Sequence, residues 1–337
     1  MTIIVAIILF GVIIFIHELG HFSFAKMSGV LVHEFSIGMG PKIISRKRGE
    51  TEYSIRAFPI GGYVSMEGED EDSKSPRAFG KKTIPQRLSV IFAGPIFNLI
   101  LAVILLIPVF MVTGVPTQEA IIGEVQKSSP AQVVGVESGD RIVDINDKKI
   151  DSWETAVNEI RASKGKKLEM TVLRDGKEKE LAVTPKLEKG VYLIGISQFR
   201  EKGVIKSIVS SFTATGSMSV QMVKFVGQLV TGTVPGGVGN SVAGPVGVIG
   251  MVSDAAKTGF INLLYFGSII SLNLGILNLL PFPALDGWRI LMIIIEGLRG
   301  GKKFDPNKEG MVNLIGLGVL MVFMIFVTYK DILRLFK

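Results

Sequence analysis

The chain has 337 residues, 47% of them hydrophobic, with a mean hydropathy of +0.44 and a formal net charge of +7. It is too apolar for an ordinary soluble protein and long enough for several membrane spans plus one small domain, so the composition predicts a polytopic α-helical membrane protein. The positive charge lacks the aromatic interleaving or basic stripe of a nucleic-acid-binding surface, and the absence of cysteine excludes disulfides and thiolate metal sites.

The first apolar segment runs from Thr2 to about Phe24 and carries the motif His-Glu-Leu-Gly-His at residues 17–21. It has no basic start and no small-residue cleavage site, which favours a retained transmembrane helix over a signal peptide. Helical residues four apart lie about 40° apart around the axis, so His17 and His21 can bind one metal ion. Glu18 is then placed to act as a general base on water beside that metal. The alternative is a chance match on a packing face, although two of the three histidines fall in the motif.

Basic residues crowd two regions, residues 26–87 and residues 299–308. The positive-inside rule makes both regions cytoplasmic and the N-terminus extracytoplasmic. His17 lies roughly 22 Å along the helix from Thr2, which puts the metal site inside the bilayer near its cytoplasmic face.

Residues 31–66 alternate in short runs separated by Gly and Pro, including Gly61 and Gly62, and predict a small β element lying against the membrane. His33 stands alone there and is more typical of a surface residue than of a ligand. The acidic residues at 67–72 predict a solvated loop, since the spacing of a calcium-binding EF-hand is missing.

A second span is predicted from about Leu88 to Val112 and contains Phe-Ala-Gly-Pro-Ile-Phe-Asn at residues 92–98. Gly94 and Asn98 share a helix face, where glycine permits close helix approach and asparagine offers a buried amide. Helix packing alone would explain both residues. The two spans and the β element between them make up the first membrane half, which is assigned to residues 1–113.

Residues 114–186 have the character of a soluble α+β domain, with alternating strands, turn signals at Gly139 and Gly176, and helices at 131–136 and 153–162. The runs at 129–131, 138–142 and 145–147 resemble a PDZ domain of the bacterial protease type. Such domains can take a peptide as an added strand. The alternative is a domain that only spaces or shields.

Residues 187–259 are assigned to a linker with one or two amphipathic helices, followed by loops at 235–237 and 243–247.

The second membrane half, residues 260–337, begins with a third span that ends at Asn-Leu-Leu-Pro-Phe-Pro-Ala-Leu-Asp-Gly, residues 278–287. Two prolines in three residues cannot continue a helix, and irregular backbone at this depth is tolerated where it lines a cavity. Asp286 either pairs with Arg289 or supplies the third protein ligand typical of metalloprotease zinc. A short interfacial helix at 290–298 and a last span at 311–328 follow.

The three motifs, in this order and over nearly the whole chain, resemble the site-2 protease family. With one PDZ-like insertion, the chain is similar to the bacterial branch that includes the regulator of sigma-E protease. The resemblance implies a multi-pass intramembrane zinc endopeptidase of the cell membrane that cuts transmembrane segments of single-pass proteins in regulated intramembrane proteolysis. In the family such substrates include anti-sigma factors and remnant signal peptides.

Carried over by position, the resemblance assigns Zn²⁺ to His17, His21 and Asp286 and catalysis to Glu18. It assigns substrate binding to a further set of residues, namely Asn98, Asn278, Pro281, Pro283, Gly61 and Gly62. One departure is Trp288, where many relatives have glycine, and its bulk is expected to narrow the site.

Two other functions compete with the protease. A membrane receptor or scaffold could hold a structural metal, but such sites usually have a closed four-ligand shell, and no fourth ligand is evident. A metal transporter predicts polar residues at the midplane of several spans, yet the other spans offer little beyond Asn98 and Asn273.

Overall fold

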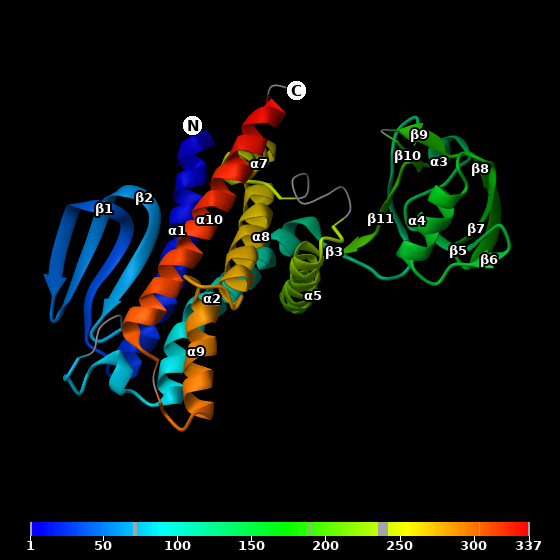
Figure 1. The fold of residues 1–337 in the computed structure, drawn as a ribbon. Coiled ribbons are helices and arrows are strands. Elements are labelled where there is room, and N and C mark those ends of the chain that lie inside the picture. Colours follow the sequence, from blue (N-terminus) through cyan, green and yellow to red (C-terminus); the bar gives the residue numbers. More distant parts are fainter. Residues whose placement is uncertain (1, 70–72, 189, 235–241, 303, 336–337) are drawn as a thin grey trace. The chain divides into compact units, whose positions relative to one another are not determined.

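The computed structural model describes residues 2–69, 73–188, 190–234, 242–302 and 304–335. The chain forms two compact units (Figure 1). One comprises Met1–Val109 with Ser211–Lys337, and the other comprises Phe110–Ser210. Two predicted features, the loop at 235–237 and the acidic residues 70–72, lie outside the described residues.

Within the described residues, four helices are long and apolar enough to cross a membrane: α1 (Thr2–Met27), α2 (Ile84–Thr113), α8 (Phe260–Asn278) and α10 (Pro306–Leu335). The four predicted spans are thus confirmed as helices. Helix α8 has the predicted bounds, α1 and α2 are a few residues longer than predicted, and α10 extends well beyond the predicted residues 311–328 at both ends. The start of α1 and the end of α10 lie at the same end of the bundle, as four successive crossings require (Figure 1).

Irregular backbone follows α8 where the prolines were predicted to stop it, and α9 (Asp286–Leu298) begins at Asp286 itself. The predicted start at residue 290 is therefore four residues late. The amphipathic region contains α5 (Val204–Thr231) and α7 (Pro245–Thr258). Met218 and Met222 of α5 pack on a small core formed by Ala102, Leu272 and Ile276.

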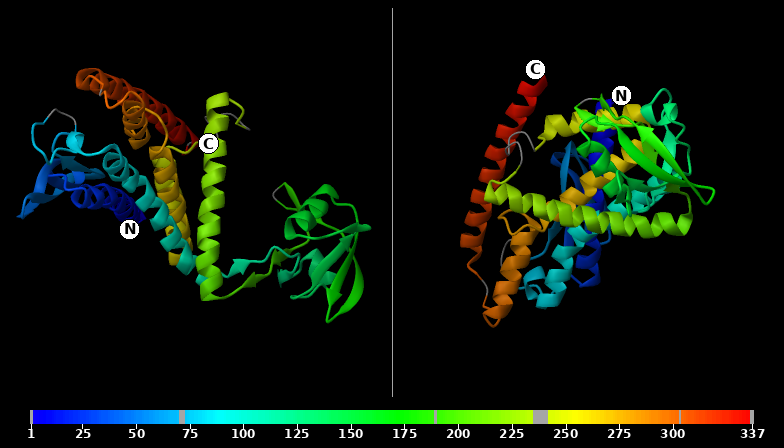
Figure 2. Two further views of the ribbon diagram at one scale, coloured as in Figure 1. Left: turned by 90° about the horizontal axis from the view of Figure 1, so that it is seen from below. Right: turned by 90° about the vertical axis from the view of Figure 1, so that its right-hand side faces the viewer.

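The β element consists of two long strands, β1 (Val32–Arg48) and β2 (Thr51–Met66), which lie beside α1 (Figures 1 and 2). Both strands bend, so that Phe35 pairs with Tyr53 on one side and with Val64 on the other. The sheet is consequently four segments wide, in the order 42–48, 51–56, 34–37 and 62–66. Among the described residues, segment 62–66 has a strand partner on one side only and so forms an edge of the sheet.

A single core ties the end of α1, the sheet, the short 3-10 helix Phe79–Lys81, the start of α2, and α9 together. Its buried members include Ala25, Val32, Phe35, Val64, Phe79, Val90, Ile91, Ile290 and Ile293. Burying this apolar surface fixes the helix that carries the two histidines against the helix that carries Asp286.

The second unit has a four-stranded antiparallel sheet in the order β6-β5-β7-β8. Its strands are β5 (Arg141–Ile145), β6 (Lys148–Lys149), β7 (Leu168–Arg174) and β8 (Lys177–Val183). Three further pairs are formed by β3 (Val115–Pro116) with β12 (Arg200–Glu201), β4 (Ile122–Val125) with β11 (Ile196–Gln198), and β9 (Lys186–Glu188) with β10 (Val191–Leu193). Helices α3 (Pro130–Val133) and α4 (Trp153–Ala162) complete it.

The second unit is the PDZ-like domain, and its core includes Ile122, Ile142, Leu168, Met170 and Ile194. The predicted boundary at residue 186 is too early. Because β11 pairs with β4, the unit extends through the strands that were assigned to the linker.

Candidate metal centre

The site forms where α1 and α2 approach closely. A Cβ on Gly20 of α1 would lie 2.4 Å from the carbonyl oxygen of Ala93, and a Cβ on Gly94 of α2 would lie 2.2 Å from Nε2 of His21. The two glycines therefore let the helix backbones meet at the level of the histidines. Because Gly94 has no side chain, the imidazole rings of His17 and His21 can lie directly against the backbone of α2.

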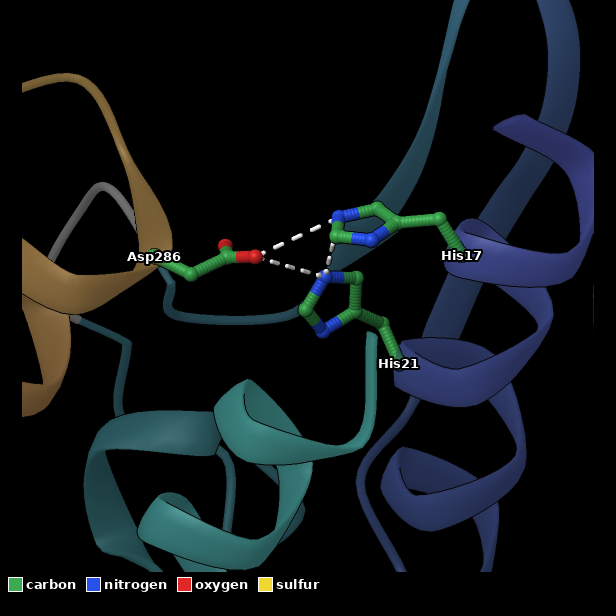
Figure 3. A group of neighbouring side chains, drawn as sticks. All are labelled: His17, His21 and Asp286. Atoms are coloured by element: carbon green, nitrogen blue, oxygen red, sulfur yellow. Dashed lines mark hydrogen bonds and ion pairs between the residues drawn. The ribbon is translucent and has the colours of Figure 1, made fainter. Parts of the chain in front are cut away.

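Three potential ligand atoms converge at this crossing (Figure 3). Oδ2 of Asp286 lies 3.2 Å from Nε2 of His17 and 3.4 Å from Nε2 of His21, and the two nitrogens are 3.2 Å apart. Atoms that bind one tetrahedral zinc ion at about 2.0–2.2 Å are separated by roughly 3.4 Å. Both the spacing and the nitrogen and oxygen donors therefore fit zinc.

Asp286 Oδ2 supports the same fit, because it is buried and has no hydrogen-bond partner among the described residues. A carboxylate oxygen buried without a donor is costly, and a cation between it and the imidazoles would remove that cost. The predicted alternative, an ion pair with Arg289, is not the arrangement seen. Arg289 pairs with Glu69 instead.

The other nitrogen of each imidazole is held by α2. Nδ1 of His21 lies 2.9 Å from the carbonyl oxygen of Val90, to which it donates, so Nε2 keeps its lone pair for a metal. Nδ1 of His17 lies 3.2 Å from the amide of Asn98, which is 0% exposed. The Asn98 backbone carbonyl in turn accepts a hydrogen bond of 2.8 Å from Oγ of Ser271 on α8.

Glu18 faces a cavity of about 800 Å³ that also borders His17, His21 and Asp286. The edge segment 62–66 forms one wall, and Gly62 lies so close that a Cβ there would be 3.0 Å from Cγ of Glu18. A carboxylate beside the three ligand atoms, in a cavity large enough for a peptide segment, has the arrangement that a general base needs.

The wall formed by residues 62–66 is fixed by a polar network behind it. Tyr63 contacts Arg56, whose guanidinium also lies 2.8 Å from Oε1 of Glu34. Burial would raise the pKa of Glu34, but hydrogen bonds from Ser54 and Arg56 outweigh it and lower that pKa to about 2. Glu34 is therefore charged at neutral pH and anchors Arg56 and Tyr63.

The other predicted site residues are spread around this centre. Nδ2 of Asn278 lies 3.4 Å from Nε2 of His17, beside the ligand atoms. Gly61 packs against Met39 and does not border the cavity. Pro281 is exposed, whereas Pro283 packs on α10.

Some residues at the cavity were missed by the sequence analysis, and one expectation about its shape is not met. Glu69, Arg289 and Asn313 border the cavity, while Trp288 is not among the described residues that do. The expected narrowing by Trp288 is therefore not supported. A signal for Asn313 did exist, since it is an amide near the start of an apolar span.

Two histidines and an aspartate around one position, a glutamate beside them and a four-span membrane unit define an intramembrane metallopeptidase. The sequence profile of peptidase family M50 matches residues 5–323, and the chain belongs to this family, the site-2 proteases. It is a multi-pass membrane zinc metalloprotease.

Two relatives illustrate the similarity. Zinc metalloprotease RasP of Geobacillus kaustophilus is 34% identical, with 99% of this chain and 98% of the relative covered. Regulator of sigma-W protease RasP of Bacillus subtilis is also 34% identical, with 99% of each chain covered. Among solved structures, the PDZ domain of an SdrC-like protein from Listeria monocytogenes has 21% identity and a TM-score of 0.23, and covers 25% of this chain and 90% of that domain.

The glycine at the helix crossing yields a first prediction. In Gly94→Ala the added methyl group would occupy the space of His21 Nε2, and the imidazole can turn away without unfolding the helices. We expect the zinc affinity of the purified protein, measured by competition with a chelator, to fall at least tenfold, on the order of the loss seen when a ligand's orientation is disturbed. Gly11→Ala is the control on α1, the helix that carries the histidines, because a Cβ there meets nothing within 4 Å. Unchanged zinc affinity in Gly94→Ala would contradict the geometry.

Proposed function

We propose that this protease cleaves the transmembrane segments of single-pass membrane proteins inside the bilayer, with anti-sigma factors and remnant signal peptides as its substrate classes. The observation that carries the proposal is the meeting of three ligand atoms and Glu18 at one cavity in the membrane unit. The relative named as a regulator of sigma-W supports the first substrate class.

We assign zinc binding to His17, His21 and Asp286 and general acid–base chemistry to Glu18. When bound, zinc polarises the scissile carbonyl and lowers the pKa of water. Glu18 accepts a proton from the attacking water and returns it to the leaving amine. Asn278, beside the ligand atoms, donates a hydrogen bond to the substrate carbonyl oxygen.

Asn98 acts through His17 rather than on the substrate. It is completely buried and faces Nδ1, the ring nitrogen that must carry a proton when Nε2 binds a metal. A half-turn of the amide about its last bond presents Oδ1, which otherwise has no hydrogen-bond partner among the described residues. Asn98 is therefore a positioning residue whose Oδ1 accepts a hydrogen bond from the Nδ1–H of His17.

The substrate segment binds in an extended form. The carbonyl groups of a transmembrane helix are hydrogen-bonded within the helix and are shielded from attack, so the helix must unwind locally. The edge at 62–66 has no strand partner on its outer side among the described residues, so it offers backbone groups beside Glu18, and Gly62 leaves room for a second backbone. Gly61, Pro281 and Pro283 shape the approaches to this edge.

The orientation follows from charge and chain order. The basic regions at 26–87 and 299–308 are cytoplasmic, so the start of α1 and the PDZ-like domain are extracytoplasmic and the cavity lies near the cytoplasmic face. Water then reaches the site from the cytoplasm.

The PDZ-like domain binds an extended peptide. A groove of about 400 Å³ lies between α4 and the strand region 192–197, and its apolar lining includes Trp153, Val157 and Ile194. An apolar groove along a strand is the geometry by which a peptide adds to a sheet.

A structural metal site is the competing explanation for the ligand cluster. Structural zinc usually takes four protein ligands, whereas the cluster among the described residues has three. With three protein ligands, a bound zinc ion would keep one position for water, as in a catalytic site.

Glu18→Gln separates the two explanations. We expect cleavage of a reconstituted single-pass substrate to fall by roughly 10² to 10⁴-fold, because the amide cannot transfer the proton. Zinc content should remain that of the unmodified protein, since Glu18 is not a ligand. Unchanged cleavage by Glu18→Gln would end its assignment as the general base.

Asn98 is tested by zinc affinity, measured by competition with a chelator. Asn98→Ala removes the acceptor for His17 Nδ1 and should weaken zinc binding by about 10 to 100-fold. Asn98→Asp keeps an acceptor oxygen, and its zinc affinity should fall less than that of Asn98→Ala. Equal affinity in Asn98→Ala and the unmodified protein would show that His17 needs no such partner.

The groove is tested with synthetic peptides that end in an apolar residue, with binding to the full-length protein followed by anisotropy of a labelled peptide. Val157→Arg should fill the groove and weaken binding at least tenfold, about 1.4 kcal/mol. Val133→Arg is the matched control, because Val133 is 81% exposed and lies outside the groove. If no peptide of such a library binds the unmodified protein, the domain only spaces or shields.

A further inference from the structure

The last span meets the irregular segment before Asp286 at two points. The amide oxygen Oδ1 of Asn313 on α10 accepts a hydrogen bond of 3.3 Å from the backbone N–H of Ala284. One turn further along α10, a Cβ on Gly316 would lie 2.5 Å from Cβ of Pro283 and 2.7 Å from its carbonyl oxygen. The backbone of α10 therefore lies directly against the segment.

Ala284 has a backbone conformation that alanine rarely adopts. Its φ is +76°, in the left-handed region, where a Cβ clashes with the following carbonyl oxygen. Such a residue keeps this conformation only when its surroundings hold it, and it tends to occur at functional sites. The hydrogen bond from the Ala284 N–H to Asn313 is one interaction that stabilises this conformation.

The backbone conformation of Ala284 sets the direction in which the chain enters α9 and thereby the position of the Asp286 side chain. Asp286 follows two residues later and is the first residue of α9. A relaxation of φ at Ala284 would redirect the chain just before α9. Oδ2 of Asp286 would then leave its position 3.2 Å from His17 and 3.4 Å from His21.

The rest of α10 has few attachments. Only 11% of its apolar window is buried, against 56% for α2. Near its far end α10 is anchored on α7, where Asp331 accepts a hydrogen bond of 2.7 Å from the backbone N–H of Gly247. The contact at Asn313 and Gly316 thus joins α10 to the segment that leads into the candidate metal centre.

We propose that Asn313 and Gly316 are positioning residues that hold Ala284 in its left-handed conformation and thereby keep Asp286 in reach of His17 and His21. The last span is in this way coupled to zinc affinity. The inference rests on the proposed assignment of Asp286 as a metal ligand.

The test measures zinc affinity of the full-length protein by competition with a chelator, alongside substrate cleavage. Asn313→Leu keeps the size of the side chain and removes the acceptor, and should weaken zinc binding about tenfold, as loss of a residue behind a ligand does. Asn313→Asp retains an acceptor oxygen and should restore most of the affinity. Equal zinc affinity in Asn313→Leu and the unmodified protein would overturn the proposal.

A double-mutant cycle tests the route through Ala284. Glycine adopts positive φ without the clash, so in an Ala284→Gly background the change Asn313→Leu should cost less than half its effect on the logarithm of zinc affinity. Equal costs in the two backgrounds would show that Asn313 does not act through Ala284.

Gly316→Ala should also weaken zinc binding, because its methyl group would push against Pro283. Gly318→Ala is the matched control on the same helix, since a Cβ there meets nothing within 4 Å. If both variants bind zinc as the unmodified protein does, the packing of α10 on the segment does not position Asp286.

Asp286→Ala distinguishes failure of this inference from failure of the proposed function. Unchanged zinc affinity in Asp286→Ala would mean that Asp286 is not a ligand, and both proposals would fall. Loss of zinc in Asp286→Ala with full affinity in Asn313→Leu and Gly316→Ala would leave the ligand assignment standing and reject only the positioning role.

Discussion

The structure depends on bringing an aspartate from the second half of the chain against two histidines from the first helix, at membrane depth. Oδ2 of Asp286 and the two Nε2 atoms are all electron-pair donors, and holding them 3.2–3.4 Å apart without a cation is unfavourable in a medium of low dielectric constant. The fold opposes this repulsion with packing. The close approach of α1 and α2 at Gly20 and Gly94 fixes the two histidines, and the core shared by α1, α2 and α9 brings the start of α9 beside them.

Helix α2 supports both halves of the ligand set. It supplies the Val90 carbonyl to one histidine and the Asn98 amide to the other. It also holds the far end of α9, because Arg87 forms an ion pair of 2.9 Å with Glu296 in which both side chains are about nine-tenths buried. A buried pair of this kind contributes little net stability but penalises any arrangement that separates its partners. α9 is therefore fixed at its end, and Asp286 at its start is left to the segment that precedes it.

The sequence could predict the elements because their signals are local. Long apolar runs predicted the four spans, the helical spacing of His17 and His21 predicted one face of the site, and the two prolines predicted the break before Asp286.

The features that the sequence could not predict depend on contacts between residues distant in the chain. Alternation does not say which segments pair, so the bent strands that give Phe35 two partners were not foreseen. The spacing of Gly94 and Asn98 showed that they share one face of a helix. It could not show that this face packs against His17. The short strands β9 to β12 carry no periodic pattern, and the domain boundary was placed too early. A positive φ at an alanine leaves no mark in the sequence at all.

The two sides of the candidate centre differ in how firmly they are held, and this has a consequence for how a substrate could act on it. The histidines sit on a helix packed against the well-buried α2, whereas the aspartate follows an irregular segment that leans on the sparsely packed α10. The cavity proposed to take the substrate segment borders Asn313 and Gly310 of α10 as well as the edge at 62–66. Displacement on entry would therefore fall on the α10 side, because fewer buried contacts oppose it there. The histidines would keep their geometry, and the position of Asp286 would be the variable that links substrate entry to the metal.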